Sequence, residues 1–205
     1  MKNYLVEFIG TFFLVFVIGL TGNPIAIGCI LMVMVYMGGH ISGAHYNPAV
    51  TIAILIRKKI ETKDALMYIV FQILGAALAA ICYQVVKGET FAPAPADDAS
   101  MISALLVEVL FTFALVSVIL NVATHSKTEG NSYYGLAIGF TVLAAAFAGG
   151  PISGGAFNPA VGTGPILIDT FMGSGSMANL GIYWLGPVLG GALGALVFKY
   201  INPDE

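Results

Sequence analysis

Long apolar runs separated by short polar stretches dominate the chain. Most runs are close to the length of about 20 residues that an α-helix needs to cross the hydrocarbon core of a bilayer. Charged residues gather in the polar stretches between the runs, which is the pattern of a multi-pass membrane protein. We therefore predict six membrane-spanning helices, at about residues 4–21, 24–38, 64–86, 101–123, 133–150 and 179–201.

Two further apolar segments are too short to span a membrane, and each follows a glycine-rich stretch and an Asn-Pro-Ala triplet. Asn is a preferred helix N-cap and Pro is favoured at the first helical position, so each triplet predicts the start of a helix. The first helix must stop before the basic run at residues 57–59 and reaches only about 13 Å. We expect half-helices at 48–56 and about 159–168, after Asn47-Pro48-Ala49 and Asn158-Pro159-Ala160.

The two halves of the chain repeat one another in opposite orientations. Each half carries three predicted spans and one half-helix, and an odd number of spans places the second half inverted in the membrane. Glu7 and Thr11 in the first span correspond to Glu108 and Thr112 in the fourth. The fold class is therefore an all-α membrane protein with an inverted-topology repeat. We predict one membrane channel domain over residues 1–205, with a first half at 1–86, an extracellular connector at 87–100 and an inverted half at 101–201.

Composition supports this reading and excludes several others. Hydrophobic residues make up 58% of the chain and charged residues 9%, which is more apolar surface than a soluble domain of this length can bury. No basic patch suggests nucleic-acid binding. The first run carries Glu7 and lacks a small-residue cleavage site, so we interpret it as a retained span. Cys29 and Cys82 lie in apolar runs, and we expect buried free thiols rather than a disulfide.

The distribution of basic residues predicts the orientation. If the N-terminus is cytoplasmic, only Lys87 among the eight basic residues falls outside, which satisfies the positive-inside rule. The residues then inside are Lys2, Arg57, Lys58, Lys59, Lys63, Lys127 and Lys199. We predict that both termini are cytoplasmic. Short loops without targeting features favour a prokaryotic plasma membrane.

The glycine-rich stretches at residues 39–46 and 149–157 place irregular backbone at membrane depth. Such backbone is tolerated only where it is buried in protein or lines a water-filled cavity. Inversion brings the N-termini of both half-helices together, and each contributes roughly half a positive charge. That field repels cations, while the side-chain amides of Asn47 and Asn158 offer hydrogen-bond donors to a passing oxygen. Selective passage of uncharged molecules is the expected function.

These motifs resemble those of the aquaporin and aquaglyceroporin (major intrinsic protein) family over essentially the whole chain. The resemblance is carried by GHISGAHYNPAV at 39–50, the second Asn-Pro-Ala, Glu7, Glu108 and Gly164-Pro165. It implies a homotetramer with one pore per subunit, centred where Asn47 and Asn158 meet. It also implies that Glu7 and Glu108 accept hydrogen bonds from the two loops. Loop carbonyls would line the path, at Gly43, Ala44, His45, Gly154, Gly155 and Ala156.

One position departs from the family pattern. Family members normally carry Arg directly after the second Asn-Pro-Ala, and this chain has Val161. By spacing from the two motifs, the selectivity filter is completed by Ile27, Ala146 and Gly155. None of these side chains carries a donor or a charge, so we expect a wide, apolar filter. Such a filter favours glycerol, urea, ammonia or undissociated metalloid acids, and it weakens the exclusion of protons and cations.

Other classes of function fit the residues less well. An ion-coupled transporter needs a titrating acid or cation site at the midplane, where this chain places amides. An intramembrane enzyme needs a nucleophile beside a base, and Ser42 and His45 lie in a loop better explained as pore wall. His40 and His45 have no third ligand nearby for a metal, so we expect them to fix the loop by hydrogen bonds. We predict no catalytic residue, no metal and no cofactor, with water, small neutral solutes and lipid as partners.

Overall fold

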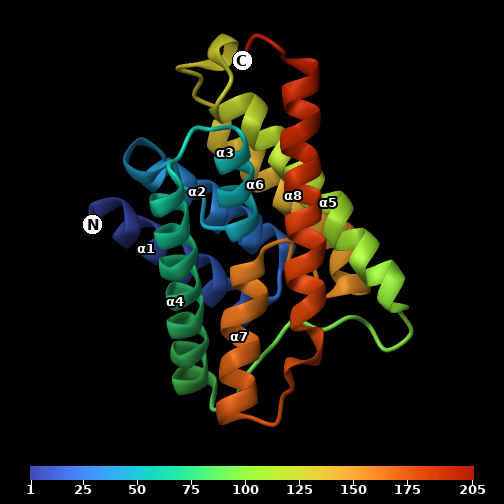
Figure 1. Cartoon of the computed structure of the whole chain (residues 1–205). Helices are drawn as coiled ribbons and strands as arrows, with labels where there is room; N and C mark the ends of the chain where they lie inside the picture. Colours follow the sequence, from blue (N-terminus) through green and yellow to red (C-terminus); the bar gives the residue numbers. More distant parts are fainter.

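Six long helices surround two short ones in the computed structural model, which describes residues 1–205 without a gap (Figure 1). All six are long and apolar enough to cross a membrane. They are α1 (Lys2–Thr21), α2 (Pro24–Ser42), α4 (Thr62–Lys87), α5 (Met101–Ala123), α6 (Tyr134–Ser153) and α8 (Leu180–Ile201). The short helices are α3 (Pro48–Ile56) and α7 (Pro159–Met172), and single 3-10 turns lie at η1 (Ser126–Thr128) and η2 (Met177–Asn179). The predicted fold of six spans and two half-helices is confirmed.

The two half-helices lie end to end in the middle of the molecule, between α4 and α8 (Figure 1). α1 packs along α4 in the first half, and α5 packs along α8 in the second. Each half-helix packs more extensively on the last helix of the other half than on that of its own, since α3 lies mainly on α8 and α7 on α4. The halves therefore interlock, and the centre of the molecule belongs to both.

The end of α7 differs from the prediction, whereas α3 has the predicted bounds. α7 continues past Ile168 to Met172 because nothing in that segment breaks a helix. It stops at Gly173, whose backbone N–H donates to the carbonyl of Asp169. Pro165 lies in the middle of α7 without ending it.

Glycines at two mirrored positions let the paired helices approach closely. A Cβ at Gly75 of α4 would lie 2.4 Å from the carbonyl oxygen of Phe8 in α1. A Cβ at Gly190 of α8 would lie 2.2 Å from the carbonyl oxygen of Val109 in α5. Small residues at helix contacts are how membrane helices gain packing in the absence of a hydrophobic driving force.

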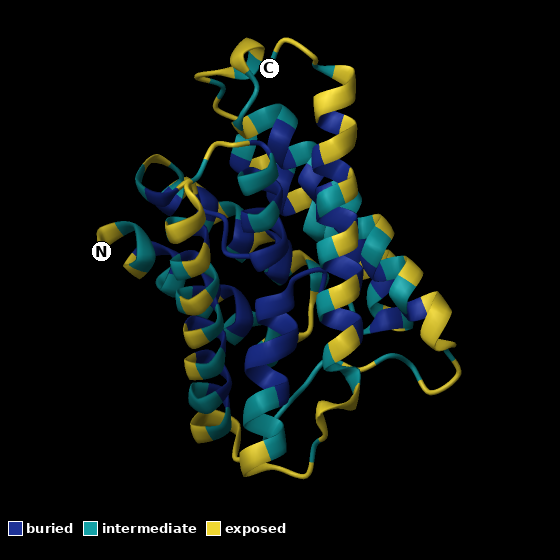
Figure 2. Cartoon of the chain, in the orientation of Figure 1, coloured by how far each residue is buried: buried dark blue, intermediate teal, exposed yellow.

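Exposed residues line the outward faces of the long helices, and the two half-helices are largely buried (Figure 2). Cys29 lies on such an outward face of α2, one turn from the exposed residues Ile25 and Val33. The expectation that both thiols are buried was wrong for Cys29, because an apolar run in a membrane protein faces lipid as readily as protein. Cys82 is partly buried.

The loops gather at two opposite ends of the molecule. We call the end formed by residues 57–61, 124–133 and 202–205 the terminal face. We call the end formed by residues 88–100 and 173–179 the connector face. In the orientation of Figure 1 the terminal face is at the top and the connector face at the bottom.

Candidate functional site

The tips of the two half-helices are capped in the same way by the asparagines of the Asn-Pro-Ala triplets. The side-chain oxygen of Asn47 accepts a hydrogen bond from the backbone N–H of Ala49 at 2.9 Å. The side-chain oxygen of Asn158 accepts one from Ala160 at 2.9 Å. Each cap satisfies one of the N–H groups that a helix leaves free at its start. Both asparagines are almost fully buried.

The same asparagines also join the two halves of the chain. The amide nitrogen of Asn47 donates to the carbonyl oxygen of Phe157 at 2.9 Å. The amide nitrogen of Asn158 donates to the carbonyl oxygen of Tyr46 at 2.9 Å. The sequence suggested that these amides keep both hydrogens free. Each in fact commits one hydrogen across the centre and keeps one, since an amide NH₂ has two donors.

Glu7 of α1 organises the first glycine-rich loop from a fully buried position. Each of its carboxylate oxygens accepts two hydrogen bonds, at distances between 2.7 and 3.0 Å. The donors are the hydroxyl of Ser42, the backbone N–H groups of His45 and Tyr46, and the side-chain amide of Gln72. A buried carboxylate requires partners of this kind, so the loop and the glutamate stabilise each other.

Glu108 of α5 does the same for the second loop and is also fully buried. It accepts hydrogen bonds from the hydroxyl of Ser153 at 2.7 Å and from the backbone N–H groups of Ala156 at 3.0 Å and Phe157 at 2.6 Å. The two carboxylates therefore lie where a role in supporting the loops requires them.

Left-handed backbone conformations recur at matching positions of the two loops. Tyr46 has φ +50° and Phe157 has φ +48°, each directly before its asparagine. A left-handed conformation costs roughly 1–2 kcal/mol for a residue with a Cβ, so both loops store strain. The bonds from the backbone N–H groups of these two residues to Glu7 and Glu108 offset that strain.

The carbonyl groups of both loops remain largely uncommitted. Tyr46 and Phe157 accept the two asparagine amides, but no protein donor reaches the three carbonyls that precede each of them in the loop. Ala44, His45 and Ala156 are buried, and a buried carbonyl without a protein partner needs another hydrogen-bond donor. The uncommitted carbonyls belong to Gly43, Ala44, His45, Gly154, Gly155 and Ala156.

A narrow cavity of about 30 Å³ runs past the two asparagines and is lined mostly by apolar side chains. At about 10–15 Å³ for one water molecule, it has room for about two. Of the four predicted filter positions, Ile27, Gly155 and Val161 line this cavity. Ala146 does not line it, and Val142, one turn earlier on α6, does. Among the predicted carbonyl positions, Ala44, His45, Gly155 and Ala156 line it and Gly43 and Gly154 do not.

Sequence reasoning missed the apolar wall that the long helices contribute. Leu14 and Ile18 of α1 line the cavity, as do Leu115 and Ile119 of α5. These residues lie seven and eleven positions after Glu7 and Glu108, so they share the helix face of the glutamates. The mirrored spacing was a signal that could have identified them. Leu31, Val35 and Ile138 complete the wall.

A vestibule of about 1420 Å³ opens from the terminal face toward this cavity. His45, Ala44 and Val50 line both spaces and therefore lie where they meet. The Nδ1 atom of His45 lies 3.1 Å from the hydroxyl of Thr51. His40 lines the vestibule as an exposed residue at the end of α2 and makes no hydrogen bond to either loop.

The two sides of the centre differ in polarity. The first half places His45 two residues before its asparagine and Thr51 four residues after it. The corresponding residues of the second half are Ala156 and Gly162. The backbone geometry of the halves is thus mirrored while the side-chain chemistry is not, and the polar side lies toward the terminal face.

Fold and site together define a multi-pass helical membrane protein with an inverted repeat and a narrow path between two half-helix tips. A family model described as "Major intrinsic protein" matches residues 1–198. The chain therefore belongs to the major intrinsic protein family, as the sequence motifs predicted.

Similar proteins come from plants and bacteria. The chain is 36% identical to "Putative aquaporin NIP4-1" of Arabidopsis thaliana, with 98% of this chain and 75% of that protein covered. It is 35% identical to "Glycerol uptake facilitator protein-like 6" of Lactiplantibacillus plantarum, with both chains covered completely. The X-ray structure of the aquaglyceroporin from Plasmodium falciparum has the same fold, with a TM-score of 0.87, 22% identity and coverage of 99% of this chain and 97% of that chain.

Proposed function

We propose that the protein is a passive channel for water and small uncharged solutes. The proposal rests on the hydrogen-bonding groups at the centre of the cavity. There the amides of Asn47 and Asn158 keep one donor each. Four loop residues that line the cavity have carbonyls without a protein partner: Ala44, His45, Gly155 and Ala156. Donors and acceptors arranged along a narrow apolar wall can exchange hydrogen bonds with a solute that moves through in single file.

The field at the centre favours neutral over cationic solutes. α3 and α7 present their N-termini to the same space, and each contributes roughly half a positive charge. A cation loses hydration in the narrow cavity and meets this field, whereas a neutral dipole can align with it. The alternative of an intramembrane enzyme lacks a paired nucleophile and base. Ser42 donates to Glu7, and His45 pairs with Thr51 rather than with Ser42.

The solute class follows from the apolar lining. Ile27, Gly155 and Val161 bring no donor and no charge to the cavity. The side chains of this wall offer a passing solute no hydrogen bonds in place of its hydration. Small neutral solutes, such as ammonia, urea, glycerol and metalloid acids, therefore lose less hydration free energy on entry than an ion does. The absence of Arg at Val161 also weakens the barrier to cations, and a leak of cations is the second candidate property.

We further propose that the terminal face is cytoplasmic. It carries four basic residues, and Lys63 and Lys199 lie in the adjoining turns of α4 and α8, while Lys87 lies toward the connector face. The exposed apolar faces of the long helices fit a bilayer and the contacts of a homotetramer.

Stopped-flow light scattering on proteoliposomes tests the proposal. With sucrose outside, vesicles should shrink faster than empty liposomes. With glycerol or urea outside, shrinkage should be followed by protein-dependent re-swelling. Shrinkage without re-swelling would restrict the channel to water, and no acceleration with any solute would contradict channel function. Reversal potentials in planar bilayers under a salt gradient report the cation leak directly.

A further inference from the structure

Arg57, the residue that ends α3, is buried although it lies in the most basic run of the chain. Its side chain is 3% exposed. One terminal nitrogen lies 2.7 Å from the carboxylate of Glu205 and 3.4 Å from the carbonyl oxygen of Thr124, and the other donates to the backbone oxygen of Glu205. The guanidinium carbon lies 4.7 Å from the ring centre of Phe198 in α8.

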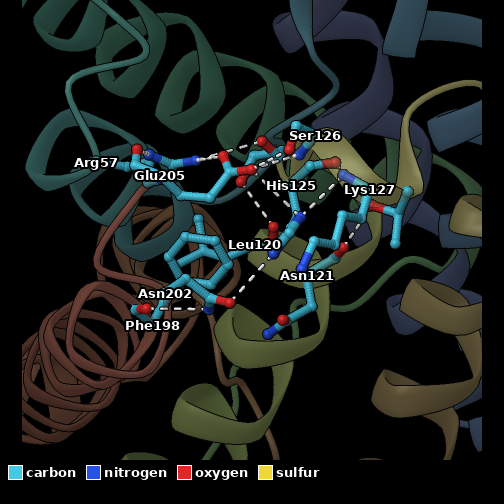
Figure 3. Close-up of polar contacts among 11 residues, drawn as sticks. Arg57, Leu120, Asn121, His125, Ser126, Lys127, Phe198, Asn202 and Glu205 are labelled. Atoms are coloured by element: carbon cyan, nitrogen blue, oxygen red, sulfur yellow. Dashed lines mark hydrogen bonds and ion pairs between the residues drawn. The ribbon is translucent and has the colours of Figure 1, made fainter.

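The carboxylate of Glu205 connects Arg57 to a third segment of the chain. Its second oxygen accepts the backbone N–H of Ser126 at 2.9 Å and the hydroxyl of the same serine. The Nδ1 atom of His125 lies 3.4 Å from that oxygen. Figure 3 shows these groups converging on Glu205 from the end of α3 and from the loop after α5. We call Arg57, His125, Ser126 and Glu205 the clamp.

The clamp contains a largely buried pair of opposite charges. The ion pair between Arg57 and Glu205 lies here, and the imidazole of His125 lies against the same carboxylate. The buried Nε atom of Arg57 has no hydrogen-bond partner, so the burial of this side chain depends on Glu205 and Thr124. Removing one partner of such a pair leaves the other charge buried without compensation.

The position of the clamp links it to the centre of the cavity. Arg57 and Asn47 cap opposite ends of α3, which is nine residues long. A helix of this length spans about 13 Å, so α3 connects the clamp directly to Asn47. Lys58, directly after Arg57, has the left-handed φ of +59°, so the chain leaves α3 in a strained turn. The corresponding end of α7 has no ion pair, and Asp169 there accepts a hydrogen bond from Thr90 at 2.5 Å.

We propose that Arg57 is a positioning residue for permeation. Glu205 holds it against Ser126 and His125, and the clamp fixes the outer end of α3 so that Asn47 stays at the centre of the cavity. This inference rests on the proposed channel function and adds a residue about one helix length away from the path. Because Glu205, His125 and Ser126 also line the vestibule, the clamp lies at its rim.

The test is a double-variant cycle on the full chain with any affinity tag at the N-terminus. Arg57→Gln and Glu205→Gln should each lower water permeability in stopped flow several-fold and change the ratio of water to glycerol flux. The double variant should lose less than the product of the two single losses, because both changes remove the pair between the guanidinium of Arg57 and the side-chain carboxylate of Glu205. Arg57→Lys keeps the charge without the two-pronged geometry and should lie between the wild type and Arg57→Gln. Lys59→Gln removes a charge from the same rim without contacting Glu205 and should leave the flux unchanged.

Hydrogen exchange of the backbone amides at residues 51–57 gives a readout that does not depend on permeation. Exchange should become faster in Arg57→Gln and Glu205→Gln and stay as in the wild type in Lys59→Gln. Unchanged exchange and flux in the two clamp variants, or a double variant whose loss equals the product of the single losses, would overturn the proposal. If Arg57→Gln does not fold, Ser126→Ala removes one hydrogen bond to Glu205 and should shift both readouts in the same direction by less. A wild type no faster than empty liposomes contradicts the channel function itself, and faster exchange would then still support the clamp.

Discussion

At the scale of single residues, the structure depends on side chains that satisfy the hydrogen bonds of loop backbone at membrane depth. Glu7 and Glu108 are such residues, because each is a charge that would be costly in a bilayer and here is surrounded by donors. The family resemblance implied that both accept hydrogen bonds from the loops, and loop N–H groups lie within hydrogen-bond distance of both. The number of donors that each one satisfies depends on the fold, and it differs between the halves.

This difference predicts unequal costs for the neutral isosteres. In Glu108→Gln the NH₂ group can take the position of the oxygen that accepts only the N–H of Phe157. One hydrogen bond is then lost, at a cost of roughly 1–3 kcal/mol of stability. In Glu7→Gln either site serves two donors, and the loss should be about twice as large. Equilibrium unfolding in mixed detergent and SDS measures both, with the exposed Glu129→Gln as control. Equal losses would mean that the two loops are not stabilised by their glutamates in the way described.

Val161 predicts how the cavity selects its solutes. Val161→Arg adds a charge and donors to a space that already faces two helix N-termini, so cation leak and glycerol flux should both fall relative to water flux. Val161→Leu adds volume without charge and should reduce glycerol flux alone. Reversal potentials and stopped-flow re-swelling separate the two effects. The same leak in both variants would show that charge at this position does not control cations.

At the scale of elements, local signals predicted where helices begin more reliably than where they end. The Asn-Pro pairs fixed both half-helix starts, and the basic run after Ile56 fixed one end. The end of α7 was missed because the segment after Ile168 has no breaker before Gly173. The helix faces were also missed, because a uniformly apolar run does not show which side meets lipid. Cys29 is an example of that ambiguity.

Close helix pairing predicts a position-specific cost within α8. Gly190→Ala would place a Cβ 2.2 Å from the carbonyl oxygen of Val109 and push α8 from α5, with a loss of roughly 1–3 kcal/mol. Gly181→Ala, in the same helix, meets nothing within 4 Å and should be neutral or stabilising by up to about 1 kcal/mol. Thermal unfolding in detergent compares the two. A similar loss in both would attribute the effect to the helix itself rather than to the contact with α5.

At the scale of the whole molecule, contacts between distant segments were beyond the reach of sequence patterns. The basic run after α3 predicted the end of that helix and the orientation of the chain in the membrane. Both predictions treat Arg57 as a solvated residue. Its partner Glu205 lies 148 positions away, and no periodicity or spacing connects them. The mirrored halves were predictable because the same motifs occur twice, whereas the clamp occurs once and has no copy to reveal it.

The clamp also predicts a dependence of stability on pH. Hydrogen bonds from Ser126, with smaller help from Arg57, lower the pKa of Glu205 from its ordinary value of 4.5 to about 2. A lowered pKa in the folded state means that the carboxylate adds stability above pH 4.5 and loses this contribution as the pH falls toward about 2. The difference in melting temperature between the wild type and Glu205→Gln should therefore shrink as the pH falls below about 5.

The same comparison in a His125→Gln background removes the nearby imidazole as a source of pH dependence. A difference that grows on acidification in that background would contradict the assignment to Glu205.

The two reciprocal bonds between Asn47 and Phe157 and between Asn158 and Tyr46 have a consequence for biogenesis. A nascent chain that has left the ribosome only as far as α4 has no acceptor for the amide of Asn47 and no α8 to cover α3. Its first loop therefore stays partly formed, in contact with water or the insertion machinery, until the second loop has been synthesised and inserted. Insertion of the spans and completion of the central path are thus separate events, because α3 of the first half is covered only after α8 has been synthesised.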